Sequence, residues 1–141
     1  MKPPATGDRL PRAALGPFGR DDVERYAAAS GDSNPIHVDP AAAKAAGLTG
    51  PVVQGMLLAG HLVRIAEAWY ADGTILAARA VFVRSVGLGE SLTVDGRVVR
   101  VERQTPWSCT LRLIARNPQG AIAAVVETCL TGEPGPAGPG A

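Results

Sequence analysis

The chain has 141 residues and a mass of 14.5 kDa, with 46% hydrophobic, 19% charged and 4% aromatic residues. At roughly 100–200 residues per domain, this length predicts a single domain and excludes a nucleotide-binding domain joined to a separate substrate domain. The 14 Lys and Arg residues against 13 Asp and Glu give a net charge of +1, and the few aromatic rings offer little for base stacking. We therefore expect no nucleic-acid partner.

The cysteine content and the hydropathy predict a cytoplasmic protein without a membrane partner. Cys109 and Cys129 are too few for a disulfide framework or a zinc site, and they suit a reducing compartment. Prolines and an aspartate interrupt the first residues, where a signal peptide needs an apolar run. No uncharged apolar stretch reaches the roughly 18 residues that a membrane-spanning helix requires.

Both ends of the chain are predicted to be disordered tails, over residues 1–9 and 132–141. The first is polar and contains prolines, and the second is rich in Gly and Pro, so neither can bury enough apolar surface to order itself. A single domain is expected between them, over residues 10–131.

The first predicted helix covers residues 20–29. Asp21 suits the positive N-terminal end of this helix, and Ser30-Gly31 resembles a C-terminal stop. A loop follows over residues 31–40, because the residue before a proline disfavours helix. One helical turn or two is expected over residues 41–46.

The longest predicted helix covers residues 52–70. Gly50-Pro51 opens it, since proline is tolerated in a first helical turn. Apolar side chains occupy most positions until Arg64 and Glu67. A helix that is apolar nearly all round is a buried helix, so the rest of the chain must wrap around it.

Four strands are predicted after this helix, over residues 75–86, 91–103, 107–116 and 121–130. In the third, apolar and polar residues alternate with the period of a half-buried strand. Asn117-Pro118-Gln119-Gly120 is a turn that joins the last two strands as a hairpin. Long antiparallel strands after one buried helix predict an α+β fold in which the sheet wraps around a long central helix.

The sequence contains only two histidines, His37 and His61. Asp32 and His37 are close together in a loop stiffened by Pro35, which can aim both side chains at one point. A carboxylate and an imidazole that share one water suit general acid–base catalysis near neutral pH. The spacing alone also fits a structural alternative, in which Asp32 caps a turn and His37 bonds to a backbone carbonyl. His61 is expected to pack rather than to catalyse.

Gly55 lies where the long helix begins. The first turn of a helix leaves amide groups unpaired at the positive end of the helix dipole. Because Gly55 has no side chain, its N–H is a candidate donor to a developing oxyanion. The alternative is that Gly55 permits close packing of the helix on the sheet.

Three segments carry a resemblance to a known family. YAAASGDSNPIH (residues 26–37), Ala43 with Gly47-Leu48, and VQGML (residues 53–57) resemble the MaoC-like hot-dog hydratases, which include (R)-specific enoyl-CoA hydratases and (3R)-hydroxyacyl-ACP dehydratases. FVRSVGLGESL (residues 82–92) is similar to the family pattern F-x-x-P-V-x-x-G-D-x-L. The likeness covers residues 10–130, and G-D-x-N-P-I-H is its most specific element.

The resemblance implies a hot-dog fold, normally paired into a dimer, with active sites near the interface. It implies that Asp32 and His37 hold a water against the β-carbon of an enoyl thioester and that Gly55 N–H binds the thioester carbonyl. It also implies that Asn34 braces the catalytic loop. The remaining residues expected at the substrate are Val53, Gln54 and Met56.

The expected activity is therefore a hydratase or dehydratase acting on an acyl-CoA or acyl-ACP thioester without metal or other cofactor. This chain departs from the family at three positions, where Gln54 replaces a histidine common in relatives, Ser85 replaces a proline, and Glu90 replaces an aspartate. Arginines on the strands, namely Arg84, Arg97, Arg100, Arg103 and Arg112, are expected mostly to face solvent. One or two near the pocket mouth are candidates for the phosphates of coenzyme A or phosphopantetheine.

Two other functions remain open from the sequence. The same pocket suits a hot-dog thioesterase or an enzyme that adds another nucleophile to an enoyl thioester. A different class of function is a non-catalytic subunit that pairs with a catalytic chain in a heterodimeric dehydratase. The presence of both Asp32 and His37 favours an active chain, which we expect to form a homodimer, with a heterodimer as the alternative.

Overall fold

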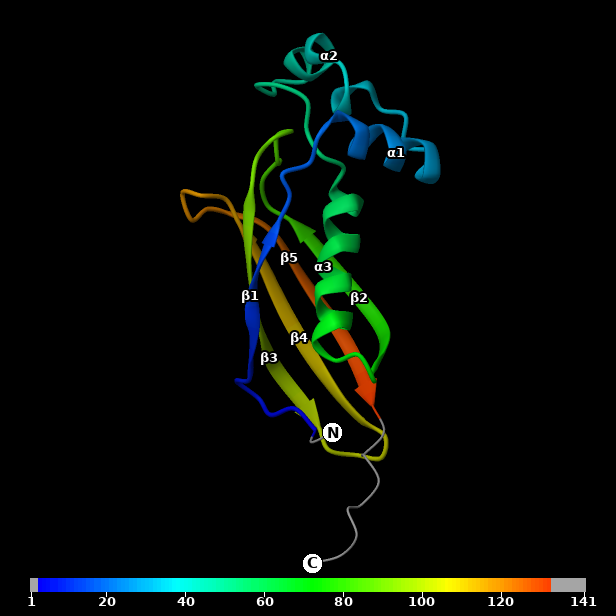
Figure 1. The fold of residues 1–141 in the computed structure, drawn as a ribbon, viewed down its shortest axis with the longest axis vertical. Coiled ribbons are helices and arrows are strands. Elements are labelled where there is room, and N and C mark those ends of the chain that lie inside the picture. The colour runs from blue at the N-terminus through cyan, green and yellow to red at the C-terminus, as the bar shows by residue number, and fades with distance from the viewer. Residues whose placement is uncertain (1–2, 133–141) are drawn as a thin grey trace, which may run out of the picture.

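A curved antiparallel sheet packs against one long helix in the computed structural model, which describes residues 3–132 (Figure 1). The strand order is β1-β3-β4-β5-β2. The elements are β1 (Arg9–Leu15), α1 (Arg20–Ser30), the short 3₁₀ helix η1 (Pro35–His37), α2 (Pro40–Ala45), α3 (Gly55–Trp69), β2 (Thr74–Phe82), β3 (Leu92–Glu102), β4 (Trp107–Arg116) and β5 (Ile122–Gly132). This arrangement confirms the predicted α+β fold with a sheet curved around a central helix.

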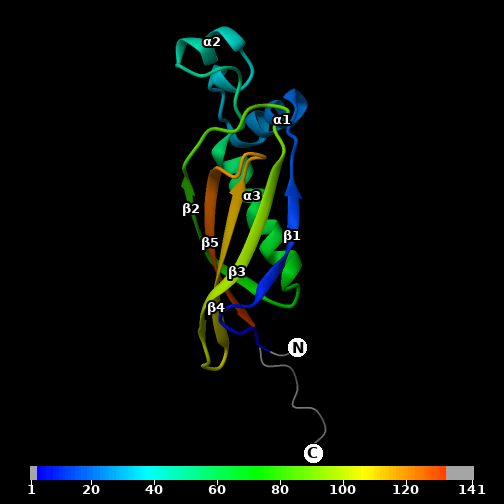
Figure 2. The same cartoon turned by 90° about the vertical axis from the view of Figure 1, so that its left-hand side faces the viewer.

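The core lies between α3 and the concave face of the sheet (Figure 2). Burial alternates along β4 with the period of two that its sequence predicts, so every second side chain faces the helix. Leu62, near the middle of α3, is fully buried, as are Leu111 and Leu113 of β4 and Leu130 of β5. Burial also raises the pKa of the Cys109 thiol, which points inward from β4, to about 11.

One face of α3 is open within the single chain. Leu58, Ala59, Leu62 and Ala66 pack on the sheet, whereas the side chain of Met56 is 61% exposed. A groove of about 520 Å³ runs between α3 and β2. The prediction of a helix buried on nearly all sides is therefore wrong for the isolated chain, because the sheet covers only one side of it.

β2 is an edge strand that pairs only with β5. The large apolar side chains that remain exposed in the described residues all lie on β2, just after it, or in the first turn of α3: Met56, Leu76, Val81, Phe82 and Val83. An unpaired strand beside exposed apolar side chains is a surface suited to association with another chain.

β1 is absent from the sequence-based prediction. Pro11 stands in the middle of it, and the pairing with β3 shifts register between Leu10 and Ala13. Proline is tolerated on an edge strand where such a bulge removes it from the hydrogen-bond ladder. The bulge also interrupts the alternation of apolar and polar residues by which a strand is predicted from sequence.

The ordered chain also extends beyond the predicted domain boundaries. Gly7 N–H donates to Val98 O, and Val98 N–H donates to Asp8 O, both at 2.8 Å, so these residues differ from the disordered tail expected over 1–9. β5 includes Gly132, while residues 1–2 and 133–141 lie outside the described residues. Within the part that is described, no helix has the length and hydropathy needed to span a membrane.

Candidate active site

The loop after α1 is shaped by a chain of short-range hydrogen bonds. Gly31 ends α1 with a φ of 78°, the left-handed conformation that suits glycine, and turns the chain toward Asp32. The Asp32 Oδ1 atom accepts the N–H of Asn34 at 3.2 Å, and Asn34 Oδ1 accepts the N–H of Ile36 at 3.2 Å. Asn34 thereby caps η1, which Pro35 begins, and the loop presents Asp32 and His37 on the same side.

His37 is held by its imidazole Nδ1 atom. This atom lies 2.7 Å from the carbonyl oxygen of Val52, and the residue is only 8% exposed. Because a carbonyl oxygen can only accept a hydrogen bond, Nδ1 carries the proton in this contact. The other ring nitrogen, Nε2, is then free to accept a proton when the ring is neutral.

The free nitrogen of His37 faces a carboxylate. Its Nε2 atom lies 3.4 Å from Oδ2 of Asp32, whose side chain is 41% exposed. This separation exceeds the usual 2.7–3.2 Å of a direct N–H···O hydrogen bond, so the two atoms are neighbours rather than a tightly bonded pair. Two proton acceptors side by side, one buried and one in contact with solvent, can bind the two hydrogens of one water.

Backbone hydrogen bonds bring two further segments to this loop. Val52 N–H donates to Ile36 O at 3.2 Å, and Val53 N–H donates to Val86 O at 2.8 Å. Val52 also forms a β-bridge with Gly87. The loop after α1, the segment before α3 and the segment after β2 therefore meet at the N-terminal end of α3.

A cavity of about 340 Å³ lies at this junction, and both His37 and Gly55 line it. Its opposite wall comes from the end of β2 and the segment after it, including Phe82, Arg84 and Ser85. A Cβ atom on Gly55 would lie 3.0 Å from the Phe82 ring, which is closer than such contacts normally are. Glycine therefore allows the aromatic ring to lie against the start of α3.

The electrostatic field at the start of α3 favours a negative ligand group. The first amide groups of a helix lack intrahelical partners and carry the positive end of the dipole. The first turn of α3 contains no acidic residue that would neutralise this charge. A carbonyl oxygen in the cavity can thus approach the Gly55 N–H.

The structure separates the predicted site residues into two groups. His37, Gly55 and Val53 line the cavity, Asp32 lies beside His37 without lining the cavity itself, and Asn34 supports the loop. Gln54 does not line the cavity. It is 1% exposed, its Nε2 atom donates to the carbonyl of Val23 at 2.8 Å, and its Oε1 atom has no partner among the described residues.

Met56 and His61 also lie away from the cavity. Met56 lines the groove between α3 and β2 instead. His61 packs edge-on against the ring of Phe18, with 5.2 Å between the ring centroids. Among residues 3–132, no cluster of three or more His, Cys, Asp or Glu side chains has the spacing of a metal site.

Sequence reasoning missed the Val52 carbonyl and the wall positions of Phe82 and Ser85, whereas Arg84, one of the arginines named as candidates near a pocket mouth, lines the cavity. The wall residues belong to the FVRSVGLGESL motif, so a signal was present. Their position opposite His37 arises from contacts between segments far apart in the chain, which local spacing does not encode.

Comparison with known proteins identifies relatives of this architecture. The family model described as MaoC like domain matches residues 2–112. The (R)-specific enoyl-CoA hydratase of Aeromonas caviae is 31% identical over 113 residues, which cover 78% of this chain and 83% of that protein. The chain spans only 4%, 15% and 45% of the lengths of three other curated relatives, which are larger proteins.

Solved structures show the same fold. The structure of the (R)-hydratase from A. caviae involved in PHA biosynthesis superposes with a TM-score of 0.83 at 27% identity, covering 95% of this chain and all (100%) of that one. A chain of the ChsH1-ChsH2 complex from Mycobacterium tuberculosis superposes with a TM-score of 0.81 at 20% identity, covering 92% of this chain and 98% of that one. At that lower identity the likeness shows the fold alone.

Proposed function

Because the chain belongs to the MaoC-like dehydratase family, we propose that it catalyses the reversible addition of water to an enoyl thioester, giving a 3-hydroxyacyl thioester. The observation that supports this most directly is the Asp32–His37 pair, which stands beside a cavity that the start of α3 also lines. One of the relatives, the (R)-specific enoyl-CoA hydratase of A. caviae, is named for the same reaction.

The arrangement provides each group that the reaction needs. A water held between Asp32 and His37 attacks the β-carbon of the enoyl group, and the pair accepts its proton. The pair then returns a proton to the α-carbon, so its protonation state is restored after each turnover. Gly55 N–H stabilises the negative charge that develops on the thioester oxygen. Positioned acid–base groups typically contribute about 10²–10⁴-fold each to such a step.

The cavities suggest where the acyl group lies. Phe82 lines both the 340 Å³ cavity at His37 and the 520 Å³ groove between α3 and β2. A thioester bound at Gly55 can extend its acyl chain past this ring into the groove. The pantetheine arm of coenzyme A or of an acyl carrier protein then leaves by the open side of the cavity.

We further propose that the active form is a homodimer. The exposed apolar side chains on β2 and at the start of α3 flank the open cavity and groove, so a second copy seated there would cover both. A heterodimer with a related chain is the alternative, since one structural neighbour is a ChsH1-ChsH2 complex.

The test is hydration of crotonyl-CoA by variants of the pair. Asp32→Asn and His37→Gln should each reduce kcat by at least 100-fold, because each removes a proton-transfer group while keeping side-chain size. Product analysis by mass should give 3-hydroxybutyryl-CoA with the wild-type protein. Release of crotonate and free coenzyme A would instead identify a thioesterase.

Matched controls are Asp72→Asn and His61→Gln, which change the same residue types outside the cavity. Both should retain kcat within about twofold, since surface substitutions usually change little. Full activity in Asp32→Asn or His37→Gln would refute the proposed roles.

A further inference from the structure

A row of arginines crosses the outer face of the sheet, on the side opposite α3. The strand register places Arg9 of β1 opposite Arg97 of β3, and Arg97 opposite Arg112 of β4. Arg112 lies opposite Glu127 of β5, which lies opposite Arg79 of β2. The row therefore spans all five strands with four guanidinium groups and one carboxylate.

The like charges in this row destabilise the sheet, and nearby ion pairs offset only part of this repulsion. Directly opposed like charges on neighbouring strands destabilise a sheet. Arg112 bonds to Glu127 at 2.7 Å, and Arg12, on the same face, bonds to Asp95 at 2.9 Å. Within residues 3–132, Arg9 and Arg97 form no ion pair, although they are directly opposite each other.

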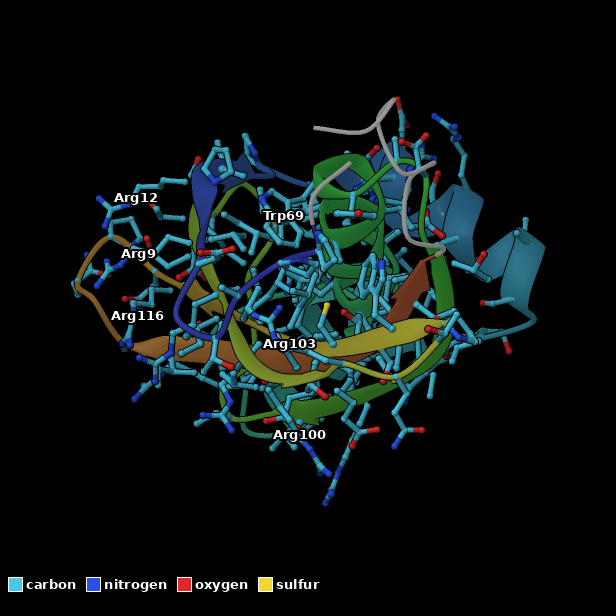
Figure 3. All side chains as sticks on the ribbon, turned by 90° about the horizontal axis from the view of Figure 1, so that it is seen from below. Arg9, Arg12, Trp69, Arg100, Arg103 and Arg116 are labelled. Atoms are coloured by element: carbon cyan, nitrogen blue, oxygen red, sulfur yellow. The ribbon has the colours of Figure 1, made fainter. Side chains whose placement is uncertain are left out.

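The arginines surround a hollow rather than a flat surface. A depression of about 560 Å³ is lined by Arg9, Arg97 and Arg112 from the row and by Arg12 and Arg116 beside it. Asp95, the ion-pair partner of Arg12, lines it as well, so the arginines outnumber the carboxylate five to one. Figure 3 shows Arg9, Arg12 and Arg116 together at one side of the molecule, with Arg100 and Arg103 elsewhere. We name this hollow the arginine basin. Its volume lies in the range of small-ligand sites, about 300–1,000 Å³.

We propose that the arginine basin binds a small ligand carrying two or more phosphate groups. Guanidinium groups pair with phosphate oxygens through two parallel hydrogen bonds. Neighbouring strands are about 4.8 Å apart, so Arg9, Arg97 and Arg112 place three such groups over about 10 Å. Arg9 and Arg97 form no ion pair among the described residues, whereas Arg112 also bonds to Glu127. One phosphate cannot contact all three, whereas linked phosphates can.

The basin lies on the face of the sheet opposite the proposed active site. Arg97 points outward from β3, while its neighbour Val98 is buried on the opposite face, toward α3. The sheet thus separates the basin from the cavity at His37. The net charge of +1 does not reveal it, because the acidic residues of the whole chain nearly equal the basic ones in number. The concave shape favours a small polyanion over an acidic protein, which would need a broader contact surface.

Calorimetric titration of the full chain with inorganic tripolyphosphate tests this proposal. We expect one saturable site whose affinity falls steeply with salt concentration. Arg97→Gln should weaken binding about tenfold or more, because hydrogen bonds to charged groups are among the stronger polar contacts. Orthophosphate should bind at least tenfold more weakly than tripolyphosphate.

The matched control is Arg103→Gln, which removes the same charge just beyond β3 and outside the basin. It should leave tripolyphosphate affinity within about twofold of wild type. Equal losses in Arg97→Gln and Arg103→Gln would show a diffuse charge effect and overturn the proposal. Saturable binding of polyglutamate but not of tripolyphosphate would overturn it in favour of an acidic protein partner.

A second measurement identifies the source of the phosphates. If the basin holds the phosphates of the substrate's own carrier, Arg97→Gln raises KM for crotonyl-CoA but not for crotonyl-N-acetylcysteamine, which lacks them. If it holds a separate phosphorylated compound, both KM values stay at the wild-type level while tripolyphosphate affinity falls. The binding measurement needs no catalysis, so it remains decisive even if hydratase activity is absent.

Discussion

Gly55 serves the site through its backbone and through the space that it leaves. Its N–H lies at the positive end of α3, and the Phe82 ring occupies the position beside its Cα. An added methyl group would push this ring, which forms part of the cavity wall. An alanine at this position would therefore force the partly exposed Phe82 ring to shift by a few tenths of an ångström.

We predict that Gly55→Ala lowers kcat/KM for crotonyl-CoA by about 10- to 100-fold, as expected for small displacements of reacting groups. In a Phe82→Ala background the same substitution should have little further effect, because the ring that it displaces is gone. Gly50→Ala is the control, since nothing lies within 4 Å of an added Cβ there. Additive losses in the double variant would contradict the packing explanation.

The position of His37 illustrates what sequence reasoning can and cannot provide. Its pairing with Asp32 is predictable because both belong to one short loop. The contact of His37 Nδ1 with Val52 O is not, because it joins residues 15 apart in the chain. Phe82, in the cavity wall, lies even further from this loop in the sequence, and only the folded sheet brings the two close together.

At the scale of elements, α1 and α3 are joined by one buried side chain. Gln54 donates from its amide to the carbonyl of Val23 in α1, while its own Oε1 is buried without a partner among the described residues. Gln54 therefore fixes the helix that precedes the Asp32 loop against the start of the helix that carries Gly55. We therefore expect Gln54 to act on the substrate only through positioning.

We predict that Gln54→Glu lowers the free energy of unfolding by about 3–5 kcal/mol at neutral pH, because it leaves an unpaired buried charge. Burial raises the pKa of such a carboxyl, so the protonated form is favoured in the folded state and stability is lost as pH rises through that pKa. Urea denaturation should therefore show recovery on acidification. Gln104→Glu, at an exposed position, should change stability by less than about 0.5 kcal/mol.

The strands differ in how readily the sequence reveals them. β4 alternates strictly and its predicted bounds, 107–116, agree with the structure. β2 was expected to continue to residue 86 but ends at Phe82, because the backbone N–H groups of Val83 and Arg84 both donate to Ala123 O and interrupt the ladder. β1 was not predicted from the sequence because Pro11 lies at its bulge.

At the scale of the whole molecule, the two edges of the sheet are unequal. Both edge strands have a bulge, but only β1 also contains a proline, which discourages pairing with another chain. β2 is longer and has exposed Leu76 and Val81. The proposed homodimer is therefore expected to form through β2 and not through β1.

We predict that the double variant Leu76→Glu/Val81→Glu is a monomer at micromolar concentration, where the wild-type chain is a dimer. Buried like charges across a symmetric interface oppose association. Ala14→Glu/Ser91→Glu adds the same charges at exposed positions near the β1 edge and should remain dimeric. Sedimentation velocity provides the measurement, and a wild-type monomer or a dimeric β2 variant would contradict the assignment.

Every residue that we propose to act on substrate lies at one end of α3. The opposite end is closed by aromatic packing, where Tyr70 meets the edge of Trp107 with 4.9 Å between ring centroids. The loop that carries Asp32 and His37 contributes no strand to the sheet. It is attached to Val52 by one backbone hydrogen bond, from Val52 N–H to Ile36 O, and by the contact of His37 Nδ1 with Val52 O. Substitution of a few loop residues can therefore alter the chemistry of this end without changing the strand pairing of the sheet.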